Sequence, residues 1–155
     1  MQTFLPYPDF ARSAAALDWR RLGKQRVEAR QIIETLIGVS KGWANHPAVK
    51  MWHGHEASLA LYLKAIIEEW IRRGYRNEAQ FVTVLDDWHV AVHFGGRPGI
   101  VLGSCSGHIT NPSWFGDEAF HASHRSNLLR KDPVRYGLLG WREPPDLPYV
   151  WPDPR

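Results

Sequence analysis

The sequence predicts a mainly α-helical fold, and three observations support this class. Apolar residues recur at intervals of three and four along several segments, which is the spacing of one face of an α-helix. Strand signals are scarce, and the best of them, "GIVLG", is short. The 155 residues are 44% apolar and 23% charged, which suits one domain with a real core. We therefore expect a compact single-domain helical bundle over residues 1–155, with long ordered loops.

Three helices are predicted in the first half of the chain. Asp9 is placed to cap a short helix, and Asp18 to cap a longer amphipathic one that ends before Gly38. Residues 56–73 show the clearest helical pattern, with one apolar face. The intervening "KGWANHP" is typical of a loop, and "AVKMWHGHE" of a short helix or an irregular link.

The second half is predicted to hold two more helices and an extended end. We expect a helix over residues 77–93 and one long ordered loop over residues 97–112. A further helix, capped by Asp117, should run to about Lys131. The prolines of "REPPDLPYVWPDPR" exclude a helix there and predict an extended Pro-rich C-terminal arm.

The composition of the chain indicates in which cellular compartment the protein is expected. Cys105 is the only cysteine, so no internal disulfide forms and a reducing compartment fits. No apolar run is long enough to span a membrane, and "MQTFLPYPDF" lacks the pattern of a secretory signal. The formal net charge of +3 is mild. We expect a soluble cytoplasmic monomer.

A basic cluster opens the second predicted helix, in "LDWRRLGKQRVEARQ". Guanidinium and ammonium groups at a helix start suit phosphate oxygens, and nearby cations favour the charged form of a carboxylate. The alternative is a solvated helix face with ion pairs such as Lys24–Glu28. The candidate functional residues here are Arg20, Arg21, Lys24, Gln25 and Glu28.

A second polar cluster lies in "FHASHRSNLLRKDP". It combines titratable rings with side chains that suit phosphates and base edges, and helical spacing would spread them over a wide polar face. The candidates for nucleic-acid binding are His121, His124, Arg125, Asn127, Arg130 and Lys131. Two alternatives remain open. One is a merely capped helix. The other is a metal site that joins this cluster to His53, His55 and Glu56 or to His89 and His93.

Aromatic residues near predicted loops form a third group. Such rings can stack on bases or wedge into a base step, although a single Trp more often packs in a core. The members are Trp43, Trp52, Trp114, Phe115 and Trp141.

Taken together, five motifs resemble the pyrimidine dimer DNA glycosylase family, which includes the phage endonuclease V type and bacterial relatives. They are "TFLPYPDF", "LDWRRLGKQRVE", "GWANHPAVKMW", "EEWIRRGY" and "FHASHRSNLLRKDPVRYG". The likeness to the bacterial branch covers nearly the whole chain. It implies a helical protein that flips a damaged or modified pyrimidine out of DNA and excises it. In the phage type an N-terminal α-amine attacks C1′, a glutamate assists, and β-elimination then nicks the strand.

The resemblance also assigns roles to residues of this chain. Gln2 disfavours removal of the first residue, so three alternatives stay open: the nucleophile is the amine of Met1, or a lysine such as Lys24, or no amine attacks and water takes its place. The phage glutamate falls at Arg21 or Gly23 here, which leaves Glu28 as the catalytic carboxylate. The implied partner is DNA, expected to be double-stranded with a lesion, with no metal and no cofactor. A DNA-repair enzyme of this kind would be associated with the nucleoid.

Two rival hypotheses stay open. One is a non-catalytic nucleic-acid-binding module on the same scaffold, and the other is a metal-dependent enzyme that uses the histidines. For the glycosylase, we expect the helices that carry Glu28 and His124 to face one another across a cleft with DNA between them. His121 and His124 would then grip a phosphate below about pH 7 and release it above.

Overall fold

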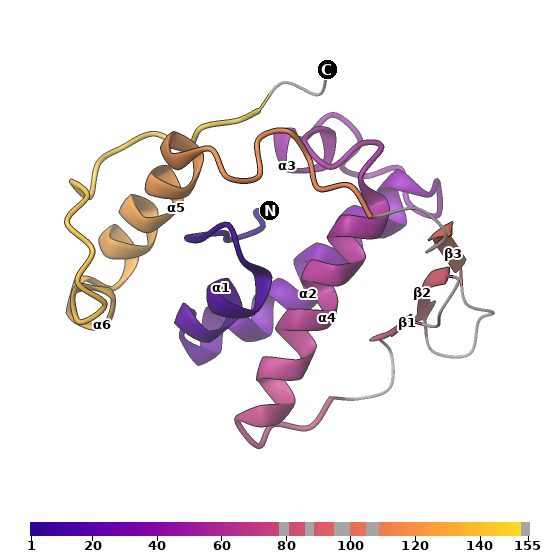
Figure 1. Cartoon of the computed structure of the whole chain (residues 1–155), viewed down its shortest axis with the longest axis horizontal. Helices are drawn as coiled ribbons and strands as arrows, with labels where there is room; N and C mark the ends of the chain where they lie inside the picture. Colours follow the sequence, from indigo (N-terminus) through magenta and orange to yellow (C-terminus); the bar gives the residue numbers. More distant parts are fainter. Residues whose placement is uncertain (78–80, 86–88, 95–99, 105–108, 153–155) are drawn as a thin grey trace.

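The computed structural model describes residues 1–77, 81–85, 89–94, 100–104 and 109–152. The predicted mainly α class is confirmed, and most of the described residues with regular structure lie in helices (Figure 1). The helices and strands, in chain order, are α1 (Phe10–Ala16), α2 (Trp19–Leu36), α3 (Pro47–Lys50), α4 (Glu56–Arg72), β1 (Phe81–Leu85), β2 (His89–Phe94), β3 (Ile100–Ser104), α5 (Glu118–Lys131) and α6 (Pro133–Gly137).

The predicted N-caps are confirmed. The carboxylate of Asp9 accepts a hydrogen bond from the Arg12 amide at the start of α1, and that of Asp117 caps α5 in the same way. Asp18 accepts from two amides in the first turn of α2. Each cap satisfies amide groups that have no partner within the helix, so the sequence locates the helix starts correctly.

The core lies where α2 crosses α4, with α1 packed beside them. Its apolar side chains are fully buried and include Leu22, Ile32, Ile33, Trp52, Leu59, Leu63 and Ile66. Gly23 allows the close approach of the two helices, since a Cβ at this position would lie 3.0 Å from the Trp70 ring. Trp52 and Trp114 belong to this core, so their rings are not available to DNA.

The predicted helix over residues 77–93 is wrong. Residues 81–85 and 89–94 form antiparallel strands, and β3 adds a third in the order β1-β2-β3. The prediction of one loop over residues 97–112 is wrong in part, because residues 100–104 form β3 where the sequence had shown only the short strand signal "GIVLG". Trp88, one of the apolar residues on which the helix prediction was based, lies outside the described residues. Alternating β-branched residues in "FVTVL" and "HVAVHF" favour strands over a helix.

The N-terminal segment, residues 1–6, occupies the middle of the helical part (Figure 1). Helix α5 lies on one side of it and helices α2 and α4 on the other. The predicted C-terminal arm has no helix or strand over residues 141–152. It runs along α5, to which it is hydrogen-bonded. The predicted end of the helix at Lys131 is confirmed, and Pro133, two residues later, begins the short α6.

Among the described residues, no helix combines the length and the apolar character that crossing a membrane requires.

Candidate active site

A polar pocket of about 970 Å³ opens beside the N-terminal segment. It is bounded by the first half of α2, the end of α5, helix α6 and the C-terminal arm. Its lining residues are Met1, Gln2, Phe4, Asp18, Trp19, Arg20, Arg21, Lys24, Gln25, Glu28, Lys131, Asp132, Val134, Arg135, Leu138 and Tyr149. Basic side chains outnumber acidic ones in this set, so the pocket suits an anionic ligand.

Glu28 is one of two buried carboxylates of this pocket among the described residues, and Asp18 is the other. Oε1 of Glu28 lies 3.8 Å from the α-amine nitrogen of Met1 and 3.5 Å from Nζ of Lys24. The Met1 side chain is 3% exposed, whereas the Lys24 side chain is 72% exposed. The structure therefore brings Met1, Lys24 and Glu28 together. Of the two amines, that of Met1 belongs to the residue whose side chain is buried.

Gln25 joins Glu28 to the N-terminal segment. Its Nε2 donates to Oε2 of Glu28 at 2.9 Å, and its Oε1 accepts from the Phe4 amide at 2.9 Å. The Tyr62 hydroxyl from α4 donates to the same Oε1 at 2.6 Å. The side chain is fully buried, so its orientation is fixed by these three bonds. Gln25 is thus placed to position Glu28 rather than to contact DNA.

Side chains of α5 hold the other side of the same segment. The Leu5 amide donates to Nδ1 of His124 at 3.0 Å, and Nδ1 of His121 donates to the Leu5 carbonyl at 2.8 Å. The Arg125 guanidinium donates to the Pro6 carbonyl at 2.8 Å. These long-range bonds satisfy the backbone groups of a buried, non-helical segment.

Both histidines are neutral in this arrangement. Burial lowers the pKa of His124 to about 3. Burial also lowers the pKa of His121, whose Nε2 accepts from the Gly116 amide at 3.0 Å. Because Nδ1 of His124 accepts, its Nε2 carries the proton, and this buried group has no hydrogen-bond partner among the described residues.

The prediction that α5 turns a wide polar face outward is wrong. His121, His124, Arg125 and Asn127 are all buried. Arg125 pairs with Glu118 and Glu143, and the Asn127 amide donates to the carbonyls of Ser123 and Leu147. These groups support the N-terminal segment and the C-terminal arm.

The expected facing of α5 and α2 is present, but the protein's own N-terminal segment lies between them. A short path of hydrogen bonds runs from His124 through Leu5 and Phe4 to Gln25 and Glu28. His124 and Glu28 are therefore on the same side of the molecule. Glu28 lines the pocket, whereas His124 does not.

Of the remaining residues predicted to bind DNA, all but Arg130 line the pocket. Arg20, Arg21 and Lys131 line it, and burial together with the charges of Arg21, Arg130 and Lys24 lowers the pKa of Lys131. Arg130 is exposed and donates to the Asn127 side-chain oxygen.

Sequence reasoning missed a link between α2 and α6. The Tyr136 hydroxyl donates to Oδ2 of Asp18 at 2.7 Å and accepts from the Asp18 amide at 3.2 Å. Burial would raise the pKa of Asp18, but hydrogen bonds from Tyr136 and Arg21 lower it to about 2. Tyr136 lies 118 positions from Asp18, so no local pattern indicates the pair.

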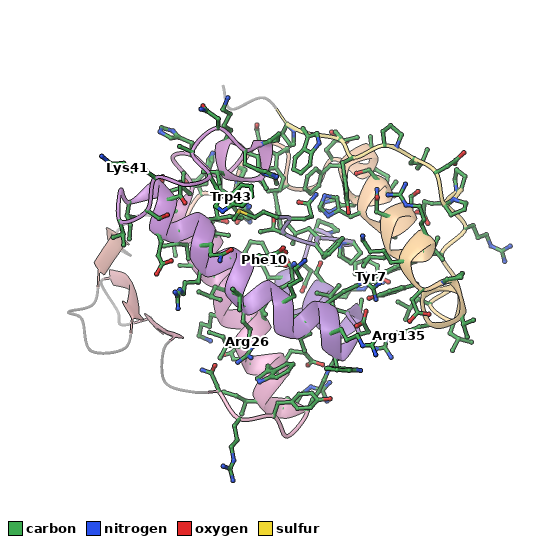
Figure 2. All side chains as sticks on the ribbon, turned by 180° about the vertical axis from the view of Figure 1, so that it is seen from behind. Tyr7, Phe10, Arg26, Lys41, Trp43 and Arg135 are labelled. Atoms are coloured by element: carbon green, nitrogen blue, oxygen red, sulfur yellow. The ribbon has the colours of Figure 1, made fainter. Side chains whose placement is uncertain are left out.

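The pocket residues Trp19, Val134, Arg135, Leu138 and Tyr149 were also missed. Arg135 lies between α6 and the start of α2 (Figure 2), where its guanidinium approaches the Leu17 carbonyl at 3.4 Å. Burial raises the pKa of Tyr149 to about 12, so its hydroxyl is neutral. The run of basic residues in "RKDPVR" could have indicated Arg135 as a residue of the site.

The alternative of a metal site finds no support in the part of the chain that is described. No group of three or more His, Cys, Asp or Glu side chains there is placed to hold an ion. The side chains of His89 and His93 lie outside the described set.

Comparison with known proteins gives one match. The family model for pyrimidine dimer DNA glycosylases matches residues 1–83, more than half of the chain. The matched segment contains Met1, Lys24, Gln25 and Glu28, and it ends before α5 and α6. Searches of the curated proteins and of the solved structures gave no significant match.

Proposed function

The chain belongs to the pyrimidine dimer DNA glycosylase family, and from that premise we propose that the pocket at Glu28 is where a damaged or modified pyrimidine is excised from DNA. The observation that carries the proposal is the 3.8 Å approach of the Met1 amine nitrogen to Oε1 of Glu28. A nucleophile and a carboxylate that meet in a buried, cation-lined pocket supply the groups that glycosidic cleavage needs.

The reaction begins when the target nucleotide leaves the base stack and enters the pocket. The Met1 amine transfers a proton to Glu28 and then attacks C1′ of the sugar. A bond forms between the amine nitrogen and C1′, the bond from C1′ to the base breaks, and the base departs with the proton that Glu28 had accepted, which leaves Glu28 ionised. Opening of the sugar ring, in which a proton passes from the amine nitrogen to O4′, then gives an iminium cation, and the negative charge of Glu28 stabilises it.

The same iminium allows strand cleavage. Loss of a proton from C2′ moves an electron pair toward the cationic nitrogen and expels the 3′ oxygen, which breaks the strand by β-elimination. Glu28 is the nearest carboxylate to the amine and would accept this proton. Gln25 keeps the carboxylate oriented through both steps, since its amide is fixed by Phe4 and Tyr62.

The basic border of the pocket is proposed to hold the strand. Arg20, Arg21, Lys24 and Lys131 face the pocket from α2 and α5, so they can meet the phosphates on both sides of one extruded nucleotide. The substrate in this proposal is double-stranded DNA with a lesion, bound by one copy of the chain.

Borohydride trapping on an abasic duplex tests the chemistry, because it reduces an iminium to a stable covalent adduct. We expect the adduct to map to the Met1 amine by peptide mass analysis. Glu28→Gln should retain DNA affinity but slow excision and trapping by about a hundredfold or more, the usual effect of losing such a group. The matched control is Glu34→Gln on the same helix, where the carboxylate pairs with Arg30 away from the pocket.

Two further variants separate the amines. Acetylation of the Met1 amine should abolish trapping, and Lys24→Arg should preserve it. An adduct on Lys24 would move the nucleophile to that residue. Tight DNA binding without any adduct or base release would favour the rival hypothesis of a non-catalytic binding module.

A further inference from the structure

Two apolar side chains stand out on the border of the pocket. Val134 is 79% exposed and Leu138 is 85% exposed, the highest values for large apolar side chains among the described residues. Both line the same pocket as Glu28. Trp19, which is 55% exposed, also lines it, whereas Leu139 and Ile71 do not. Exposed apolar groups are common on proteins, but a pair at the mouth of a cationic pocket calls for a ligand with apolar surface.

Helix α6 presents this pair from a fixed base. Asp132 caps the helix, and Tyr136 on its inner side is fully buried. The Tyr136 ring stacks on Trp141 with centroids 5.5 Å apart, and its hydroxyl is bonded to Asp18 at the start of α2. The pair therefore projects from a turn that is tied to the helix carrying Glu28. A rigid base matters, because a side chain that separates two stacked groups must keep its own position while it does so.

The surroundings indicate what the pair meets. Arg135 lies in the same short helix, Lys131 precedes it, and Arg20 and Arg21 face it from α2. Cations on either side of an apolar projection match duplex DNA, where phosphates border a stack of apolar base faces. Branched apolar side chains of this size are used as wedges between base pairs by proteins that kink DNA.

We propose that α6 is a DNA wedge, in which Leu138, with Val134 beside it, enters the base stack and holds open the step from which a nucleotide is extruded into the pocket. The inference rests on the proposed function, because it takes the pocket at Glu28 as the destination of that nucleotide. The wedge makes extrusion easier, and the basic residues keep the opened duplex bound.

The experiment uses the full chain and a duplex with 2-aminopurine beside a non-cleavable abasic analogue. Wild-type protein should raise the fluorescence of the unstacked base. Leu138→Ala should lose most of that rise and should slow excision from duplex DNA by about tenfold or more, the scale expected when unstacking is no longer assisted. Leu139→Ala, at the adjacent and less exposed residue outside the pocket, is the matched control and should behave as wild type.

A second measurement separates the wedge from the chemistry. Trapping on a single-stranded abasic oligonucleotide requires no opening of a stack, so Leu138→Ala should equal wild type there. Equal fluorescence for Leu138→Ala and Leu139→Ala would overturn the wedge. A dimer that Leu138→Ala dissociates, with unstacking unchanged, would overturn it in favour of a contact between copies. If wild-type protein unstacks the base but traps nothing, the proposed chemistry fails while the wedge stands.

Discussion

The hydrogen bonds around His124 require its neutral form. Nδ1 accepts from the Leu5 amide, so a proton added there would break that bond inside the protein. Burial holds the pKa of the ring at about 3, below the ordinary value of 6.5. The ring is therefore uncharged between pH 6 and 8, and the prediction that His124 grips a phosphate by titrating in that range is not supported by its pKa.

The same shift makes stability depend on pH. Between about pH 6.5 and pH 3 the unfolded chain binds a proton at His124 and the folded chain does not. The contribution of this residue is complete above pH 6.5, and it is lost as the pH falls through this window. The free energy of unfolding should therefore decrease on acidification by up to about 1 kcal/mol per pH unit from this residue. The lowered pKa of His121 acts in the same direction.

Urea denaturation of wild type and of His124→Gln at pH values from 7 to 4.5 measures this effect. Glutamine retains an acceptor for the Leu5 amide but does not titrate, so its curve should be flatter. His53→Gln, which changes an exposed histidine, serves as the control and should follow wild type. Parallel curves for all three proteins would show that His124 does not dominate the acid response.

At the scale of elements, α2 combines three tasks along one helix. Its N-cap Asp18 is bonded to α6, its inner side carries Gln25 and Glu28, and its pocket side carries Arg20, Arg21 and Lys24. Helix α5 faces it with buried polar groups that hold the N-terminal segment, and only Lys131 of its basic candidates lines the pocket. In the proposed function, DNA contacts are thus concentrated on α2 and at the start of α6.

The basic residues that line the pocket are therefore expected to control the affinity for DNA. Replacing Arg20 and Lys131 together by Ala should flatten the slope of log affinity against log salt by about 2, since each phosphate contact contributes about 0.9. The control replaces the exposed Lys41 and Lys50, which do not line the pocket. Lys41 lies near the far end of α2 from Arg135 (Figure 2).

Arg125→Ala should behave differently from these surface changes. Its guanidinium joins Pro6 to Glu118 and Glu143, so the loss should lower thermal stability more than it changes the salt slope. A salt slope that changes with Arg125 but not with Arg20 and Lys131 would place the DNA on the other side of α5.

At the scale of the whole molecule, the sequence predicted those features that depend on residues close together in the chain, such as where helices begin and end. Capping residues and apolar periodicity located α1, α2, α4 and α5, and the motif around Glu28 drew attention to the carboxylate that we propose as catalytic. The strands β1 and β2 were missed because a helical spacing was fitted to a segment whose β-branched residues favour strands. The burial of α5 was missed because its polar groups bind a segment more than a hundred residues away.

Amide hydrogen exchange tests that long-range support. The Phe4 and Leu5 amides donate to buried acceptors, so they should exchange about as slowly as core amides of α4 such as that of Leu63. His124→Ala should accelerate exchange at Leu5 without an equal effect at Leu63. Rapid exchange at Leu5 in wild type would mean that the segment opens independently of the core.

The threading of residues 1–6 between α2 and α5 also sets an order of events during synthesis. Leu5 leaves the ribosome early, but its partner His124 follows 119 positions later. Contacts of such separation close late, because the intervening chain must first be made and folded. The amine that faces Glu28 therefore acquires its full surroundings only when α5 emerges. A nascent chain carries Met1 from the start, yet the proposed pair of amine and carboxylate is fully enclosed only after most of the chain has been translated.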